Sequence, residues 1–186
     1  MHDVIPAGEG LNVFALVIYV PDPLGAFLDD LRRELVPEYD PHAHVSVLPP
    51  RTLPVTIEAA AEEAGALTAL RAPFEVELTK VSVFPVTGVV YLEVGKGGDE
   101  LRRMHAAMNA SALGFEEPFV YHPHVTLAQE LPEGTVETVL ERAARLWGDY
   151  PGKRTFLAER AVLVQNTPDN CWIDLRECVL GATTAR

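Results

Sequence analysis

Apolar and polar residues along the chain follow two different periods. Leu24, Phe27, Leu28, Leu31 and Leu35 fall on a single stripe if residues 22–37 form a helix. Residues 42–48 instead alternate apolar with polar side chains, which is typical of a strand with one buried face. The same reasoning predicts strands over 11–20, 42–48, 74–84, 89–94, 119–128, 155–165 and 171–180, and helices over 22–37, 56–70, 99–113 and from 135 onward.

The order of these predicted elements repeats. Strand, helix, strand, helix, strand occurs over residues 11–84 and again over 87–165, and a final strand over 171–180 follows. This duplication predicts an α+β fold with two pseudo-symmetric, intertwined lobes, antiparallel-rich sheets with flanking helices, and an active-site cleft between the lobes. We expect one domain over 1–186, with a loose arm over 1–10 where proline and glycine are frequent.

The charge balance restricts the partners of the chain. Its 186 residues include 15 Lys and Arg against 27 Asp and Glu, a formal net charge of −12. An acidic protein is poorly suited to clamp a duplex backbone, so we expect no duplex DNA partner. The longest apolar stretch near the N-terminus, 13–20, is too short to span a bilayer, and no basic segment precedes it. We therefore expect a cytoplasmic monomer without membrane contact.

Two similar segments carry the candidate chemistry. Residues 42–47 read His-Ala-His-Val-Ser-Val and residues 122–127 read His-Pro-His-Val-Thr-Leu, and their second histidines, His44 and His124, are 80 positions apart. Because side chains alternate along a strand, His44 shares a face with Ser46, and His124 shares a face with Thr126. An imidazole can move a proton and a hydroxyl can donate to a phosphate oxygen. The pair of motifs indicates acid-base chemistry at a phosphate ester.

Paired His-x-[Ser/Thr]-aliphatic motifs in a duplicated α+β chain resemble those of the 2H phosphoesterase superfamily, and particularly its bacterial 2′-5′ RNA ligase-like group. The resemblance implies catalytic roles for His44, Ser46, His124 and Thr126, with no metal and no cofactor. It also implies a nucleotide cyclic phosphate or an RNA end as substrate, which is hydrolysed at a 2′,3′-cyclic phosphate or resealed as a 2′-5′ linkage.

Other interpretations of these residues stay open at this stage. The two His-x-His pairs can instead bind zinc in a metallohydrolase, or the chain can bind a nucleotide or RNA end without turnover. Arg51 follows the first motif and Tyr121 precedes the second, so both are candidate substrate contacts, although strand alternation also favours packing for Tyr121. Five aromatic residues are candidates to stack on a base or to fill the core: Phe84, Tyr91, Phe119, Trp147 and Trp172.

Overall fold

The computed structural model describes residues 10–38 and 42–181, so the arm predicted over 1–10 lies, except for Gly10, outside the described residues. Within these described residues, four helices and eight strands follow one another. They are β1 (Phe14–Tyr19), α1 (Leu24–Leu35), β2 (His44–Arg51), α2 (Ile57–Ala69), β3 (Phe74–Val83), β4 (Val90–Val94), α3 (Gly98–Asn109), β5 (His124–Ala128), α4 (Val136–Gly148), β6 (Thr155–Ala158), β7 (Arg160–Asn166) and β8 (Trp172–Val179).

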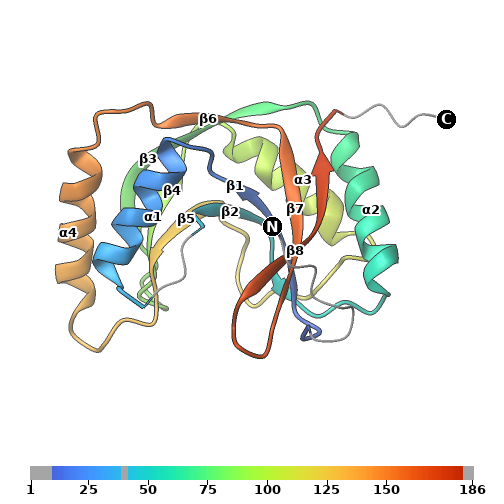
Figure 1. Cartoon of the computed structure of the whole chain (residues 1–186), viewed down its shortest axis with the longest axis horizontal. Coiled ribbons are helices and arrows are strands. Elements are labelled where there is room, and N and C mark those ends of the chain that lie inside the picture. Colours follow the sequence, from blue (N-terminus) through green and yellow to red (C-terminus); the bar gives the residue numbers. More distant parts are fainter. Residues whose placement is uncertain (1–9, 39–41, 182–186) are drawn as a thin grey trace, which may run out of the picture.

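The strands form one curled antiparallel sheet in the order β6-β3-β4-β5-β2-β1-β7-β8. Helices α1 and α4 pack on the half that contains β3, β4 and β5, while α2 and α3 pack on the half that contains β2, β7 and β8 (Figure 1). Each half combines elements from both predicted repeats. The two motif strands, β2 and β5, are the middle pair of the sheet. The α+β architecture with flanking helices agrees with the sequence prediction.

Alternation along the motif strands separates a core face from an open face. The buried positions of β2 and β5 include Val45, Val47, Val125 and Leu127, all in the main hydrophobic core that the helices cover. The first five residues of both strands share one burial pattern, in which the histidine and the hydroxyl residue are half-buried and the aliphatic residues are buried. The sequence pattern therefore directs the motif side chains to the face opposite the core. We call this the open face.

One predicted strand is divided in the structure, and another is shorter than predicted. The strand expected over 155–165 is divided at Glu159 into β6, which pairs with β3, and β7, which pairs with β1 in the other half of the sheet. The apolar pattern over 155–165 is continuous, so it does not reveal that the two parts of this segment pair with different strands. The strand expected over 119–128 begins only at His124, because the preceding segment forms a loop anchored by the Tyr121 side chain.

The β2 strand continues through Pro49 and Pro50 to Arg51, where the sequence indicated a loop. Proline removes a backbone donor, which a central strand cannot tolerate. Beyond Val45, however, β2 has no registered partner on the β5 side and pairs only with β1. This part of β2 therefore behaves as an edge.

None of the helices in the described part of the chain is both long and apolar enough to span a bilayer.

Candidate active site

A single backbone register brings the two motifs together. Val45 on β2 lies directly opposite Val125 on the antiparallel strand β5. One step along each strand places His44 beside Thr126, and Ser46 beside His124. The two histidines are thus diagonal neighbours on the open face, with Cα atoms about 7–8 Å apart by the usual strand spacing. A phosphate group fits between imidazoles at this separation.

Identical hydrogen bonds orient the two imidazoles. Nδ1 of His44 lies 2.7 Å from the carbonyl oxygen of His42, and Nδ1 of His124 lies 2.7 Å from the carbonyl oxygen of His122. Because a carbonyl oxygen can only accept, Nδ1 carries the hydrogen in both rings. Each Nε2 is therefore left to accept a proton, or to donate one from the imidazolium. In each motif, the backbone carbonyl of the first histidine therefore orients the ring of the second.

Burial lowers the pKa of both motif histidines, but their charged neighbours differ. The pKa of His44 is lowered to about 4, mainly by desolvation; the hydrogen bond to the His42 carbonyl opposes this effect, and the charges of Arg32, His124 and His42 contribute to it. Desolvation also lowers the pKa of His124, and the hydrogen bond to the His122 carbonyl opposes this effect. The nearby His122 ring lowers the pKa of His124, whereas the Glu93 carboxylate raises it. A carboxylate thus favours the imidazolium form of His124.

Aromatic rings surround the second motif. Phe84 stacks on Tyr91 with ring centroids 4.0 Å apart, and the His124 ring meets both rings nearly edge-on at 5.0 and 5.3 Å. On the other side of the site, the Tyr19 ring lies 6.4 Å from the His44 ring. Of the five aromatic candidates, Phe84 and Tyr91 are therefore at the site. Trp147, by contrast, is a residue of α4 that is buried in the main core.

The segment before His44 is held by a residue that the sequence does not single out. His42 has a φ of 138°, in a region that non-glycine residues rarely adopt. Asp29 Oδ1 on α1 accepts hydrogen bonds from the His42 and Ala43 amides at 3.0 and 2.7 Å. These bonds fix the peptide whose carbonyl orients His44. Asp29 thus supports the site from outside the motif.

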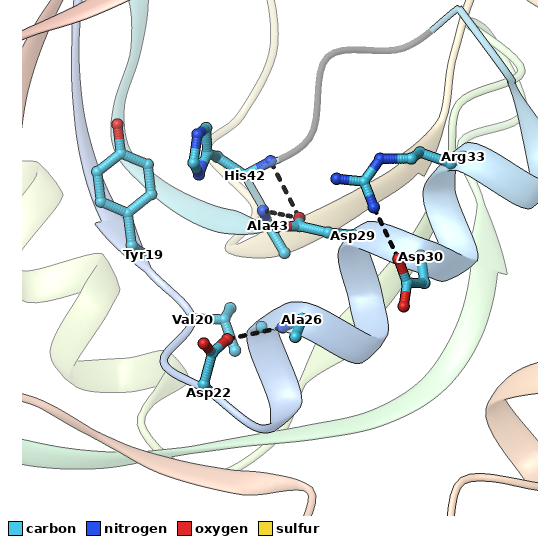
Figure 2. A pocket seen from close by; sticks show the side chains of 10 residues that line it. Tyr19, Val20, Asp22, Ala26, Asp29, Asp30, Arg33, His42 and Ala43 are labelled. Carbon is cyan, nitrogen blue, oxygen red and sulfur yellow. Dashed lines mark hydrogen bonds and ion pairs between the residues drawn. The ribbon is translucent and has the colours of Figure 1, made fainter.

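Asp29 also lines a pocket of about 300 Å³ beside the site, between α1 and the start of β2 (Figure 2). The charged groups of this pocket are engaged internally. Asp30 pairs with Arg33, and Asp22 accepts the Ala26 amide at the start of α1. No motif hydroxyl lines the pocket. The pocket is therefore lined by residues that position His42, and we do not assign it to the reacting phosphate.

Arg51 and Tyr121, the predicted substrate contacts, are engaged inside the protein. The Arg51 side chain is 1% exposed and forms an ion pair with Glu117, and its other nitrogens donate to Asn109 and to the carbonyls of Pro49 and Leu113. The Tyr121 hydroxyl donates to the Ser46 carbonyl at 2.8 Å. The prediction that Arg51 contacts substrate does not agree with this burial. Strand β2 carries Arg51 into the packed end of α3, where its side chain is bound by the protein itself.

The Tyr121 ring stacks on His105 with centroids 3.9 Å apart, and His105 Nδ1 lies 2.8 Å from the Val47 carbonyl oxygen. Both rings therefore support the backbone of β2 next to the motif. Within residues 10–38 and 42–181, no group of three or more His, Cys, Asp or Glu side chains is arranged to hold a metal ion.

Sequence comparison identifies relatives along most of the chain. The family model of the 2′-5′ RNA ligase superfamily matches residues 20–179. A Geobacillus kaustophilus protein named putative phosphoesterase is 29% identical over 128 residues, which cover 64% of this chain and 70% of that protein. A Bacillus licheniformis protein of the same name is 30% identical over 122 residues, covering 61% of this chain and 70% of that protein.

Structure comparison finds the same architecture in an experimental structure. The crystal structure of Escherichia coli LigT in its apo form superposes with a TM-score of 0.61 at 18% identity, covering 91% of this chain and 98% of LigT. At this identity the likeness concerns the fold alone.

Proposed function

The chain belongs to the 2′-5′ RNA ligase superfamily, and on this basis we propose that it is a phosphoesterase that hydrolyses a 2′,3′-cyclic phosphate of a nucleotide or RNA end by paired acid-base catalysis. One observation carries the proposal. The register of β2 with β5 makes His44 and His124 diagonal neighbours on one face, with Ser46 and Thr126 beside them, and matching Nδ1 hydrogen bonds orient the two imidazoles. Two imidazoles on either side of a phosphorus atom are the arrangement that in-line displacement requires.

In the proposed reaction, Nε2 of one histidine takes a proton from water as the water oxygen attacks phosphorus. Nε2–H of the other histidine gives its proton to the ribose oxygen as the bond from this oxygen to phosphorus breaks. The Ser46 and Thr126 hydroxyls donate to the non-bridging oxygens, where negative charge increases in the transition state. The product is a ribose phosphomonoester. Attack by a ribose hydroxyl in place of water would join RNA ends, so the same site is suited to the related ligation.

The substrate class is supported by what is known of a protein with the same fold. Crystal structures of E. coli LigT have been obtained with 3′-AMP and with phosphate. A 3′-phosphomonoester is the product that hydrolysis of a 2′,3′-cyclic phosphate yields when the bond to the 2′ oxygen breaks. The electronegative surface expected from a net charge of −12 favours small substrates over long polyanions.

The test is turnover of 2′,3′-cyclic mononucleotides by the purified protein and by the His44→Ala and His124→Ala variants. Each replacement is expected to lower kcat/KM by about 10² to 10⁴, the usual effect of positioned proton transfer. The double variant should be little worse than the poorer single variant, because groups that act in one step are not additive. Near-normal turnover by a folded single variant would contradict the mechanism.

The Ser46→Ala and Thr126→Ala variants are expected to lose about 10- to 100-fold each, because one hydrogen bond to the developing charge is removed while proton transfer remains. Activity should persist in excess chelator. Chelator-sensitive turnover with stoichiometric zinc would instead support a metallohydrolase, and saturable nucleotide binding without any product would support a binding protein.

A further inference from the structure

The two motif histidines face different residues on the strands that flank them. Tyr19 on β1 lies directly opposite His44, and Glu93 on β4 lies directly opposite His124. Directly opposite residues of antiparallel strands share a face, so each of these side chains stands beside a histidine on the open face. β1 and β4 occupy equivalent places in the sheet, one on each side of the β2–β5 pair. A phenol at one matched position and a carboxylate at the other therefore break the near-symmetry of the site.

Neighbouring side chains hold the Glu93 carboxylate in place. Ser82 Oγ on β3 donates to Glu93 Oε1 at 3.0 Å, and His122 Nε2 lies 3.4 Å from Glu93 Oε2. The Glu93 side chain is 26% exposed. A carboxylate that is oriented and partly removed from water acts on its neighbours more strongly than one on a solvated surface.

The charged and titratable groups near the two histidines differ in sign. His44 is influenced by Arg32 from α1, by His42 and by His124. Tyr19 is also beside His44, and its hydroxyl donates to Asp174 on β8 at 2.7 Å. The carboxylates on this side are bound elsewhere, Asp174 by the Tyr19 hydroxyl and Asp29 by the His42 and Ala43 amides, and the charged groups that act on the pKa of His44 are cationic.

The groups near His124 include an acid. Tyr91 lies against its ring, His122 and His44 are nearby, and Glu93 is the carboxylate that acts on it. The His122 ring opposes Glu93 at His124, but a carboxylate acts on His124 while the charged groups that act on His44 are all cationic, so the two histidines differ in how readily they are protonated. Two chemically identical motifs thereby acquire different properties.

Building on the proposed function, we propose that Glu93 is a positioning residue that makes His124 more readily protonated than His44, so that His124 is the acid and His44 the base in cyclic phosphate hydrolysis. Neutral His44 removes the proton from water while the oxygen–phosphorus bond forms. His124 gives its proton to the ribose oxygen while the phosphorus–oxygen bond breaks. His44 then releases its proton to solvent and His124 takes up a proton from solvent, which restores the starting state.

The acid can be identified with a leaving group that needs no proton. The experiment compares a 2′,3′-cyclic mononucleotide with its analogue in which sulfur replaces the leaving ribose oxygen. A thiol has a pKa near 8.5, so a thiolate departs without protonation far more readily than an alkoxide. We expect His124→Ala to regain at least about 10-fold on the sulfur analogue relative to the oxygen substrate. His44→Ala should lose the same factor on both compounds.

The Glu93→Gln variant tests the carboxylate itself. Without its charge, the alkaline limb of the kcat/KM profile on the oxygen substrate should move down by about one pH unit, and the sulfur analogue should show no such change. Glu93→Asp, which keeps the charge, should restore the parent profile. Tyr19→Phe is the matched control at the equivalent position, and its ratio of oxygen to sulfur rates should equal that of the parent.

Each outcome decides a different point. Rescue of His44→Ala by sulfur, in place of His124→Ala, would reverse the roles while leaving the paired-histidine function intact. An unchanged alkaline limb in a folded, active Glu93→Gln variant would remove Glu93 from the mechanism. If the parent turned over neither compound, the proposed function would fail, and the assignment of roles with it.

Discussion

Variants of the ion pair between Arg51 and Glu117 can distinguish a structural role of Arg51 from a role in substrate binding. The Arg51 side chain is 1% exposed and that of Glu117 is 13% exposed, and the pair joins β2 to the loop after α3. Glu117 has a second contact, since its Oε2 atom lies 3.5 Å from His105 Nε2. We consider the single variants Arg51→Met and Glu117→Gln and their double variant.

The expected magnitudes follow from burial. Removing one partner of a buried ion pair leaves an uncompensated charge and costs about 3–5 kcal/mol of unfolding free energy. Arg51→Met should reach this range, because Asn109 and the Leu113 carbonyl also lose their donor. Glu117→Gln should cost somewhat less, since the guanidinium keeps those other acceptors. The double variant should be more stable than the sum of the two losses predicts, by about 2 kcal/mol.

The assay is urea unfolding followed by circular dichroism, with kcat/KM measured well below the unfolding midpoint of each variant. If Arg51 is structural, its replacement lowers the midpoint while turnover of a cyclic nucleotide falls by less than about threefold. A loss of stability under about 1 kcal/mol together with a tenfold or greater loss of kcat/KM would refute this account. That result would return Arg51 to the substrate contacts that its sequence position predicts.

Two further predictions concern His44 and the residue that positions it. Asp29→Ala removes the acceptor for the His42 and Ala43 amides and should lower kcat/KM about tenfold. Asp30→Ala, which loses only an exposed pair with Arg33, is the control, and an equal loss in both variants would contradict the assignment. Because the pKa of His44 is lowered from 6.5 to about 4, the unfolded chain binds more protons between these values. The stability from burying neutral His44 is complete above pH 6.5 and is lost as the pH falls toward 4. Urea midpoints should therefore decrease more from pH 7 to pH 5 in the parent than in His44→Ala, and parallel decreases would exclude this contribution.

Much of the architecture could be predicted because it depends on local patterns. The apolar stripe of 24–35 specifies α1, and Thr56 accepts the Ala59 amide at the start of α2 as a capping residue should. The motif strands alternate as predicted, so His44 and Ser46 share a face that Val45 does not. Errors occurred where a strand changed its partner. The run over 155–165 reads as one strand, yet β6 and β7 belong to different halves of the sheet.

The supporting residues of the site could not be found in this way. Glu93 and Tyr19 acquire their positions only from the registers of β4 with β5 and of β1 with β2. Asp29 is one of several acidic residues on α1, and its bonds to the His42 and Ala43 amides depend on how α1 lies against the start of β2. No spacing in the sequence distinguishes these residues from solvated acids or core aromatics.

Two matched His-x-[Ser/Thr] strands can be recognised from the linear order of residues alone, because side-chain alternation and an offset of 80 positions do not depend on how the chain folds. The pairing of Val45 with Val125, which brings the motifs onto one face as diagonal neighbours, is visible only in the folded protein. The tertiary structure also places a carboxylate beside one histidine and a phenol beside the other. Strand register is set by packing between segments far apart in the chain, and the charge around an imidazole depends on that packing rather than on its neighbours in sequence.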